Sequence, residues 1–337
     1  MKSIVIFVLF FVVSPALRAQ ELFPVAEPAS TVPKGALGVR LFDEGYKESG
    51  LVRDLAACRL MYGITPRLSL YGTVTASDFH EKTLPFDFIS HNHGGQTFGG
   101  ANTPAQGVAY PLIYNSVDLY AKYRFVSSDG QNTHFRMAAY AEASKVSPPS
   151  HEAEPDLLIH TSGFGAGLIA TWLRQRFAGS LSSGFILPLA YSGDAYDRYG
   201  GIYPTTITYG NALTYSLSLG YRLLPASYTG YRQTNWNVYI EFTGKAYGAA
   251  QVSQKDGPAA NALPIPITIN TPILQAGSYL DVIPGIQCIL SSTYRIDFST
   301  ALPLVNKSYD HLYPFVLVGI QRYFFFSNSG KSDKLAP

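Results

Sequence analysis

The sequence predicts an all-β fold: a transmembrane antiparallel up-and-down β-barrel of about 12 strands with long external loops. Two observations lead to this expectation. Apolar and polar residues alternate in repeated runs of roughly nine to eleven residues, the length that a tilted membrane-spanning strand requires. Charged residues make up only 14% of the chain, against roughly 25% in soluble domains, so a large outer surface is expected to face lipid.

The alternation is clearest at residues 116–125. Val117, Leu119 and Phe125 share one face of the predicted strand, while Asp118 and Lys122 share the other. Successive strand side chains point to opposite faces, so this segment has one apolar and one ionic face. A soluble β-sandwich exported to the periplasm would show the same pattern with its apolar face inward, and this is the rival fold.

The N-terminus predicts export and, with the barrel, a place in the outer membrane of a Gram-negative cell envelope. Lys2 precedes an apolar core at residues 4–13, and small residues Ala16 and Ala19 follow. This order is typical of a secretory signal peptide, assigned here to residues 1–19. After it, no apolar run of about eighteen residues remains, which excludes membrane helices and leaves a barrel as the spanning structure.

The remaining chain divides by the same patterns. Residues 20–34 are predicted to be a periplasmic N-terminal segment, residues 35–326 the barrel, and residues 327–337 a polar tail. Loss of the signal peptide lowers Lys+Arg from 25 to 23, equal to the 23 Asp+Glu. A neutral chain has no broad basic surface, so no nucleic-acid partner is expected.

Connection lengths support twelve strands. Short turns alternate with longer loops, as in outer-membrane barrels, and this places both termini on the short-turn, periplasmic side. The predicted strands are residues 35–42, 57–63, 67–77, 116–125, 134–144, 163–172, 176–187, 213–222, 236–245, 279–289, 294–302 and 314–326.

Two hairpins carry a family resemblance. Residues 62–72, YGITPRLSLYG, resemble a turn of the phenol-degradation MetA-type outer-membrane barrels, and residues 278–287, SYLDVIPGIQ, are similar to their penultimate hairpin. The resemblance implies an outer-membrane barrel for passage of small, often hydrophobic compounds, and it supplies no catalytic residues. The aromatic end of the last strand, residues 323–326, resembles the signal read by the barrel assembly machinery. The expected partners are therefore that machinery, outer-membrane lipid and an unidentified small solute.

Charged residues on the predicted inward faces are the candidate site. Both signs occur on neighbouring strands, so they either form ion-pair ladders that brace the barrel or line a solute path. The predicted lumen-lining residues are Asp118, Lys122, Arg124, Arg136, Glu142, Glu241, Lys245, Asp281, Arg295 and Asp297. Aromatic residues at the outward strand ends are expected to form an interfacial girdle: Tyr123, Phe125, Phe164, Trp172, Phe177, Tyr221 and Trp236.

Three other residue patterns give only weak evidence for a functional site. His160 and Ser162 have the His-x-Ser spacing of outer-membrane phospholipase A but no orienting carboxamide follows, so no enzyme activity is expected. His91 and His93 lie in a Gly-rich loop and favour no metal site. No cofactor is expected, and Cys58 and Cys288 are interpreted as apolar fillers.

The predicted function is passive passage of small solutes, with a preference for hydrophobic or aromatic ones implied by the resemblance alone. The alternative is a non-conducting structural or surface-recognition barrel that acts through its long external loops at residues 78–115 and 246–278.

Overall fold

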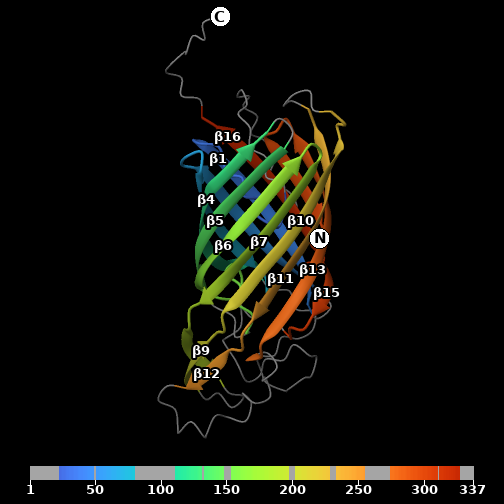
Figure 1. Ribbon diagram of the computed structural model, residues 1–337. Coiled ribbons are helices and arrows are strands. Elements are labelled where there is room, and N and C mark those ends of the chain that lie inside the picture. The colour runs from blue at the N-terminus through green and yellow to red at the C-terminus, as the bar shows by residue number, and fades with distance from the viewer. Residues whose placement is uncertain are drawn as a thin grey trace, which may run out of the picture.

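The computed structural model describes residues 23–48, 51–79, 111–130, 133–147, 153–196, 202–227, 233–254, 274–309 and 311–326. They form a tall barrel of tilted strands with a smaller sheet at one end (Figure 1). The barrel strands are β1 (Ala36–Glu48), β2 (Leu51–Gly63), β3 (Leu68–Ser77), β4 (Ile113–Asp129), β5 (Thr133–Val146), β6 (Gly163–Arg174), β7 (Phe177–Pro188), β10 (Ala212–Leu224), β11 (Asn235–Tyr247), β13 (Gly277–Leu290), β14 (Tyr294–Ser299), β15 (Leu302–Asn306) and β16 (Val316–Phe325).

The wall is a closed antiparallel barrel with twelve strand positions. Neighbours in the sequence pair in a meander, and the ring closes where β1 pairs with β16. Strands β14 and β15 share one position, because both pair with β13 on either side of residues 300–301. The predicted fold class is therefore confirmed, and each of the twelve predicted strands corresponds to one of these positions.

The observed strands extend beyond the apolar alternation at the long-loop end. Strand β1 continues to Glu48 and β2 begins at Leu51, whereas the sequence places these limits at residues 42 and 57. Backbone pairing persists there, for example between Gly45 and Asp54. Alternation is imposed by lipid on one side of the wall, so it marks the height of the lipid-facing band rather than the full strand.

Three short strands lie outside the barrel wall. They are β8 (Tyr191–Tyr196), β9 (Ile202–Thr208) and β12 (Gln251–Gln254), which pair in the order β12-β9-β8 below the barrel in Figure 1. The prediction that these residues are loop was wrong. These strands are only four to seven residues long, so they hold too few alternating positions for period-two alternation to distinguish them from loop.

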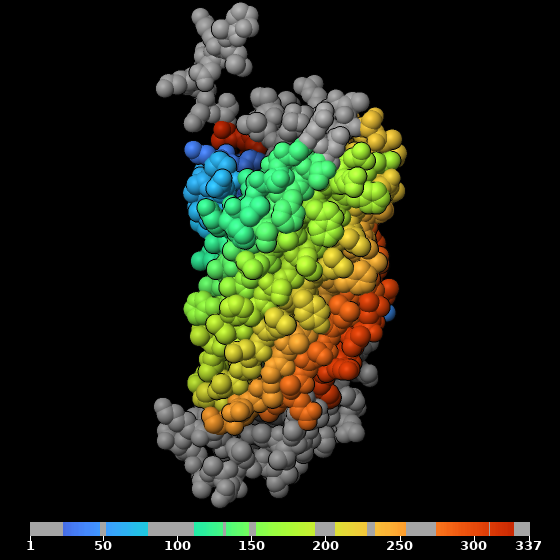
Figure 2. All heavy atoms as spheres, viewed as in Figure 1, coloured from blue at the N-terminus to red at the C-terminus, as the bar shows by residue number. Residues whose placement is uncertain are grey.

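The outer face of the wall is apolar. Leu119 is 64% exposed and Phe177 is 62% exposed, and the side chains form a continuous surface in Figure 2. The exposed residues include six of the seven predicted girdle aromatics: Tyr123, Phe125, Phe164, Trp172, Phe177 and Trp236. The seventh, Tyr221, is half-buried, with its ring 4.7 Å from that of Phe177. Within the described residues, no helix is long and apolar enough to cross a membrane.

Tyrosine rings line one side of the inner wall. Tyr120 stacks between Tyr71 and Tyr140, with ring centroids 5.3 and 5.1 Å apart. Glycines make room for the last ring, since a Cβ at Gly184 would lie 2.0 Å from the Tyr140 hydroxyl and one at Gly167 would lie 2.6 Å from its ring. The missing side chains let Tyr140 lie flat against the neighbouring strands.

A charge placed on the outer face tests the lipid-facing assignment. Leu119 lies near the middle of β4, so Leu119→Arg is expected to cost about 2–4 kcal/mol of unfolding free energy in lipid vesicles, measured by urea titration. Ser128→Arg lies on the same outer face near the end of the strand, beside the exposed Phe135, and should cost about 1 kcal/mol or less. Equal stability of the two variants would contradict a lipid-facing wall.

Candidate functional site

Residues 23–32 lie inside the barrel rather than beyond its short-turn end, and we call them the N-terminal plug. Phe23 and Ala29 are 1% and 0% exposed. The backbone N–H groups of Val25 and Ala26 donate to the two carboxylate oxygens of Glu241, at 3.0 and 2.7 Å. The sequence predicts a periplasmic position for residues 20–34, whereas the structure places residues 23–32 of that range within the lumen.

Other wall side chains take the next backbone groups of the plug. The N–H of Ala29 donates to Thr171 Oγ1 at 2.8 Å, and the N–H of Val32 donates to Ser69 Oγ at 2.9 Å. Ala29 also packs against Ile169 in a small apolar cluster. Buried backbone amides need partners, and the barrel supplies them from side chains instead of a strand ladder.

The plug carbonyl groups accept from the lumen cations. Arg295 donates to the carbonyl of Phe23 at 3.0 Å, and Lys122 donates to that of Pro28 at 2.8 Å. Arg40 donates to the carbonyl of Pro24. Proline has no N–H of its own, so the two prolines present acceptors to these cations without adding a donor that must be satisfied.

Glu27 is the charged residue of the plug. Its carboxylate pairs with Lys122 at 3.0 Å and with Arg59 at 2.8 Å. Burial alone would raise the pKa of Glu27, but the charges of Lys122 and Arg59 outweigh burial and lower this pKa to about 2. The glutamate therefore stays ionised and anchors the plug across the ordinary pH range.

A second segment, residues 153–162, fills the lumen from the long-loop end, and we call it the inward loop. The carbonyl of Leu158 accepts from Asn115 Nδ2 and Ser116 Oγ, both at 2.7 Å. Lys245 Nζ pairs with Glu154 at 2.9 Å and with Asp156 at 3.3 Å. The apolar side of the loop is buried as well, because Leu157 is 4% exposed within the largest apolar cluster at this end.

His311, from the connection between β15 and β16, joins the inward loop to the wall. Its Nε2 lies 2.8 Å from Asp281 Oδ2, and its Nδ1 lies 3.5 Å from Glu154 Oε2. Burial would lower the pKa of His311, but these two carboxylates outweigh it and raise the pKa above its ordinary value. The imidazole bridges the loop and strand β13, and the two carboxylates favour its protonated form.

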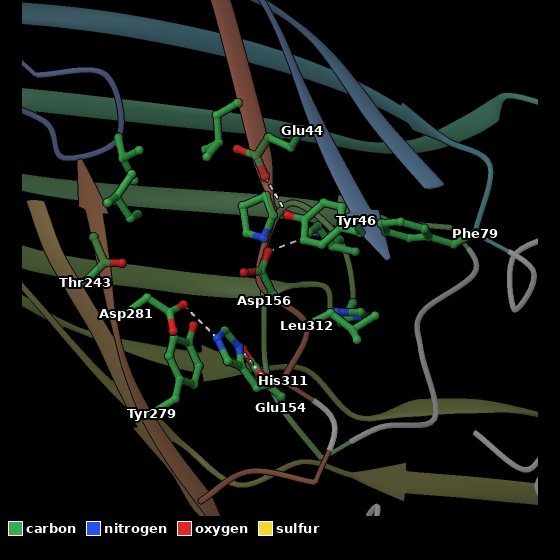
Figure 3. Close-up of a pocket in the computed structure, with 16 residues that line it drawn as sticks. Glu44, Tyr46, Phe79, Glu154, Asp156, Thr243, Tyr279, Asp281, His311 and Leu312 are labelled. Carbon is green, nitrogen blue, oxygen red and sulfur yellow. Dashed lines mark hydrogen bonds and ion pairs between the residues drawn. The ribbon is translucent and has the colours of Figure 1, made fainter. Parts of the chain in front are cut away.

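A cavity of about 250 Å³ remains between the two segments (Figure 3). Val25 of the plug and Ile159 of the inward loop both line it. A second cavity of about 150 Å³ shares Val25, Glu44 and Leu317 with the first, so the two adjoin. The lumen thus holds a chamber bounded by two segments that contact the wall mainly through side chains.

The structure buries most of the predicted lumen residues. Asp118, Lys122, Glu241, Lys245, Asp281, Arg295 and Asp297 are each at most 4% exposed, and Arg124, Arg136 and Glu142 are half-buried. Arg124 donates to the carbonyl of Pro66 and Arg136 to Ser30 Oγ. Glu142 lies against Gly165. Whether these residues line a solute path stays a prediction.

The expected ion-pair ladders between neighbouring strands are not what holds these charges. None of the ten residues has an oppositely charged residue as its register partner among the described strands; Lys122, for example, faces Ser69 and Tyr140, and Glu241 faces Ser218 and Ile283. Five of the ten reach inward instead: Lys122, Arg136, Glu241 and Arg295 contact the plug, and Lys245 contacts the inward loop. Asp297 is bound within the wall, by Arg295 of its own strand at 2.7 Å.

The weaker sequence patterns gain no support as catalytic sites. Ser162 Oγ accepts from the N–H of Val146 at 3.0 Å, and His160 lines the cavity while Ser162 does not. Cys58 and Cys288 are free thiols. His91 and His93 lie outside the described residues, and so do residues 1–22 and 327–337. Within the described residues, no group of three His, Cys, Asp or Glu is arranged to hold a metal ion.

Comparison with solved structures agrees with the barrel. The chain is similar to the COG4313 outer membrane channel from Pseudomonas putida F1, with a TM-score of 0.50 and 12% identity over 90% of this chain and 100% of that one. At this identity the likeness shows the fold alone. The beta domain of the Bordetella autotransporter BrkA (TM-score 0.39, 10% identity, 87% and 100% covered) and the Pseudomonas putida toluene transporter TodX (0.33, 9%, 88% and 92%) are too distant to carry an argument. No family model and no curated protein matches the sequence.

The contacts of Glu241 give a test of how the plug is held. Glu241→Ala leaves the N–H groups of Val25 and Ala26 without acceptors, which costs roughly 1–3 kcal/mol for the buried donor of Ala26 and less for that of the exposed Val25. Hydrogen exchange of these two amides should therefore accelerate at least tenfold. Thr31→Val is the matched control, since it removes an exposed bond to the carbonyl of Pro66. Unchanged exchange in Glu241→Ala would show that this residue does not hold the plug.

His311 gives the inward loop a pH dependence. Its pKa is raised in the inward conformation, so its stabilisation is complete below the ordinary value of about 6.5 and is lost as pH rises through the raised pKa. The methyl NMR signals of Leu157 should therefore report a growing second conformation in alkaline buffer. In His311→Gln the signals should no longer change with pH, and an unchanged pH response in this variant would contradict the assignment.

Proposed function

We propose that this chain is an outer-membrane channel for small solutes, closed in the observed conformation by the N-terminal plug and the inward loop. The observation that carries the proposal is the chamber between them, bounded by segments held through side-chain contacts. Such contacts can break without unpairing any strand of the wall. The likeness of fold to a protein described as an outer membrane channel supports the same reading.

The lining of the chamber favours a solute that is small and partly apolar. Aromatic and aliphatic side chains share it with carboxylates: Tyr46, Phe79, Tyr279, Leu312 and Pro314 are among the lining residues. Binding sites for small molecules are typically apolar cavities with a few placed polar groups. A solute with a hydrophobic or aromatic body fits this lining.

The second candidate is a non-conducting barrel that acts in surface recognition. The sheet of β8, β9 and β12 favours it, because it projects beyond the wall at the long-loop end (Figure 1). The two candidates differ in one property, the ability of the plug to leave the lumen.

A reversible lock on the plug separates them. Ala29→Cys with Thr171→Cys, in a background of Cys58→Ala and Cys288→Ala, places two thiols where a plug amide now contacts the wall at 2.8 Å. Liposome swelling with small neutral solutes then measures flux in the oxidised and reduced forms of one protein. We expect flux to rise at least tenfold on reduction.

A deletion of residues 23–32 completes the experiment, with heat-modifiable gel migration as the check that the barrel has folded. The deletion should show flux at least equal to that of the reduced double-cysteine variant. No flux in any folded form would overturn the channel and favour the recognition barrel. Equal flux in the oxidised and reduced forms would show that solutes do not pass the plug.

A further inference from the structure

The chamber carries an excess of negative charge at its wall. Four carboxylates line it, from β1, the inward loop and β13 (Figure 3). They are those of Glu44, Glu154, Asp156 and Asp281. The basic groups among the lining residues are His160 and His311, with Lys245 reaching the inward loop from β11.

The ion pairs of these cations involve mainly the two carboxylates of the inward loop, and fewer reach the wall carboxylates of Glu44 and Asp281. Lys245 pairs with both Glu154 and Asp156. Glu44 accepts from the hydroxyl of Tyr46 at 2.6 Å and makes no ion pair with a described residue. This wall carboxylate therefore has no direct ion pair among the described residues, although Arg40 lines the adjoining cavity with it.

Asp281 provides an independent sign of a missing ligand. Its Oδ2 takes His311, but its Oδ1 is buried and has no hydrogen-bond partner among the described residues. The side chain is only 5% exposed. A buried neutral acceptor without a hydrogen bond costs roughly 1–3 kcal/mol of stability, and a charged one costs more. A ligand that donates a hydrogen bond to Asp281 Oδ1 would remove this cost.

Aromatic rings surround the same space. Tyr279 stacks on the imidazole of His311, with centroids 3.3 Å apart, and Tyr46 packs edge-on against Phe79 at 5.5 Å. Aromatic faces attract cations, ammonium groups included. Carboxylates and aromatic rings together match the two parts of an organic ammonium ion, its charged head and its hydrocarbon body.

The size of the chamber and its ligand geometry favour such an ion over a metal. A volume of about 250 Å³ is several times the ~30 Å³ that a water molecule occupies in the liquid. The carboxylates that line the chamber do not form one of the three-residue groups able to hold a metal ion, a limit that applies to the described residues.

We propose that the chamber binds a small organic ammonium ion, with its charged head at the carboxylates of Asp281 and Glu44 and its body against the aromatic rings. This deepens the proposed function and rests on it in one respect, that the chamber is a station on the solute path. Binding itself requires no passage through the barrel.

The test compares two probes that differ in charge and share a body. 2-Phenylethylammonium and neutral 2-phenylethanol are titrated at pH 7 into the purified full chain in detergent, with binding followed by calorimetry. We expect the ammonium to bind at least tenfold more tightly. Asp281→Asn keeps the shape but removes the charge, and it should weaken ammonium binding by roughly tenfold or more while leaving the alcohol unchanged.

Two further variants make the test decisive. Asp54→Asn is the control, since Asp54 alternates along β2 with inward-facing Arg53 and does not line the chamber. It should bind both probes like the parent protein. Glu44→Gln should weaken ammonium binding in the same direction as Asp281→Asn, and it decides the question if Asp281→Asn fails the heat-modifiability check.

The outcomes separate this inference from the channel proposal. Equal affinity for the two probes, or no loss of ammonium affinity in the folded carboxamide variants, overturns the cation site even if the barrel conducts. Selective ammonium binding in a barrel that shows no flux supports the cation site and overturns the channel.

Discussion

The arrangement inside the barrel depends on one constraint: in the described strands, none of the ten predicted lumen charges has an oppositely charged register partner on a neighbouring strand. Lys122 and Glu241 each face neutral register partners, yet both are fully buried. A buried charge is strongly unfavourable unless it is paired or hydrogen-bonded. Partners must then come from chain that enters the lumen. The N-terminal plug offers carbonyls and Glu27 to the cations and backbone N–H groups to Glu241, so the plug and the wall charges require each other.

This dependence gives the two ends of the lumen different characters. Near the short turns, the plug binds the wall cations through backbone carbonyl groups and through the single carboxylate of Glu27. Near the long loops, the inward loop adds the carboxylates of Glu154 and Asp156 to those already on the wall. Negative charge therefore collects around the chamber, next to aromatic side chains. The same chain that closes the barrel also shapes the chemistry of the space it leaves.

The wall could be read from the sequence because lipid imposes a strict pattern on it. Alternation at residues 116–125 gave the outward face of Leu119 and the inward face of Lys122, and the structure agrees on both. The plug could not be found this way, because residues 23–32 have no periodicity and take their conformation from side chains distant in sequence. The inward loop and the small sheet of β8, β9 and β12 could not be predicted either, because neither has a sustained period-two alternation. One signal in the sequence did point to chain inside the lumen: many inward-facing charges have no oppositely charged residue at the expected position on the neighbouring strand.

The most direct test measures where the plug lies in a membrane. Spin labels at Thr31→Cys and Ser127→Cys, with Cys58 and Cys288 replaced by alanine, give the plug-to-wall distance in lipid vesicles by electron spin resonance. We expect a single narrow distance for the parent barrel and a broader distribution once Lys122→Met removes one of the two cationic partners of Glu27 and the donor to the Pro28 carbonyl. A broad distribution in the parent barrel would contradict the claim that the lumen charges hold the plug in place.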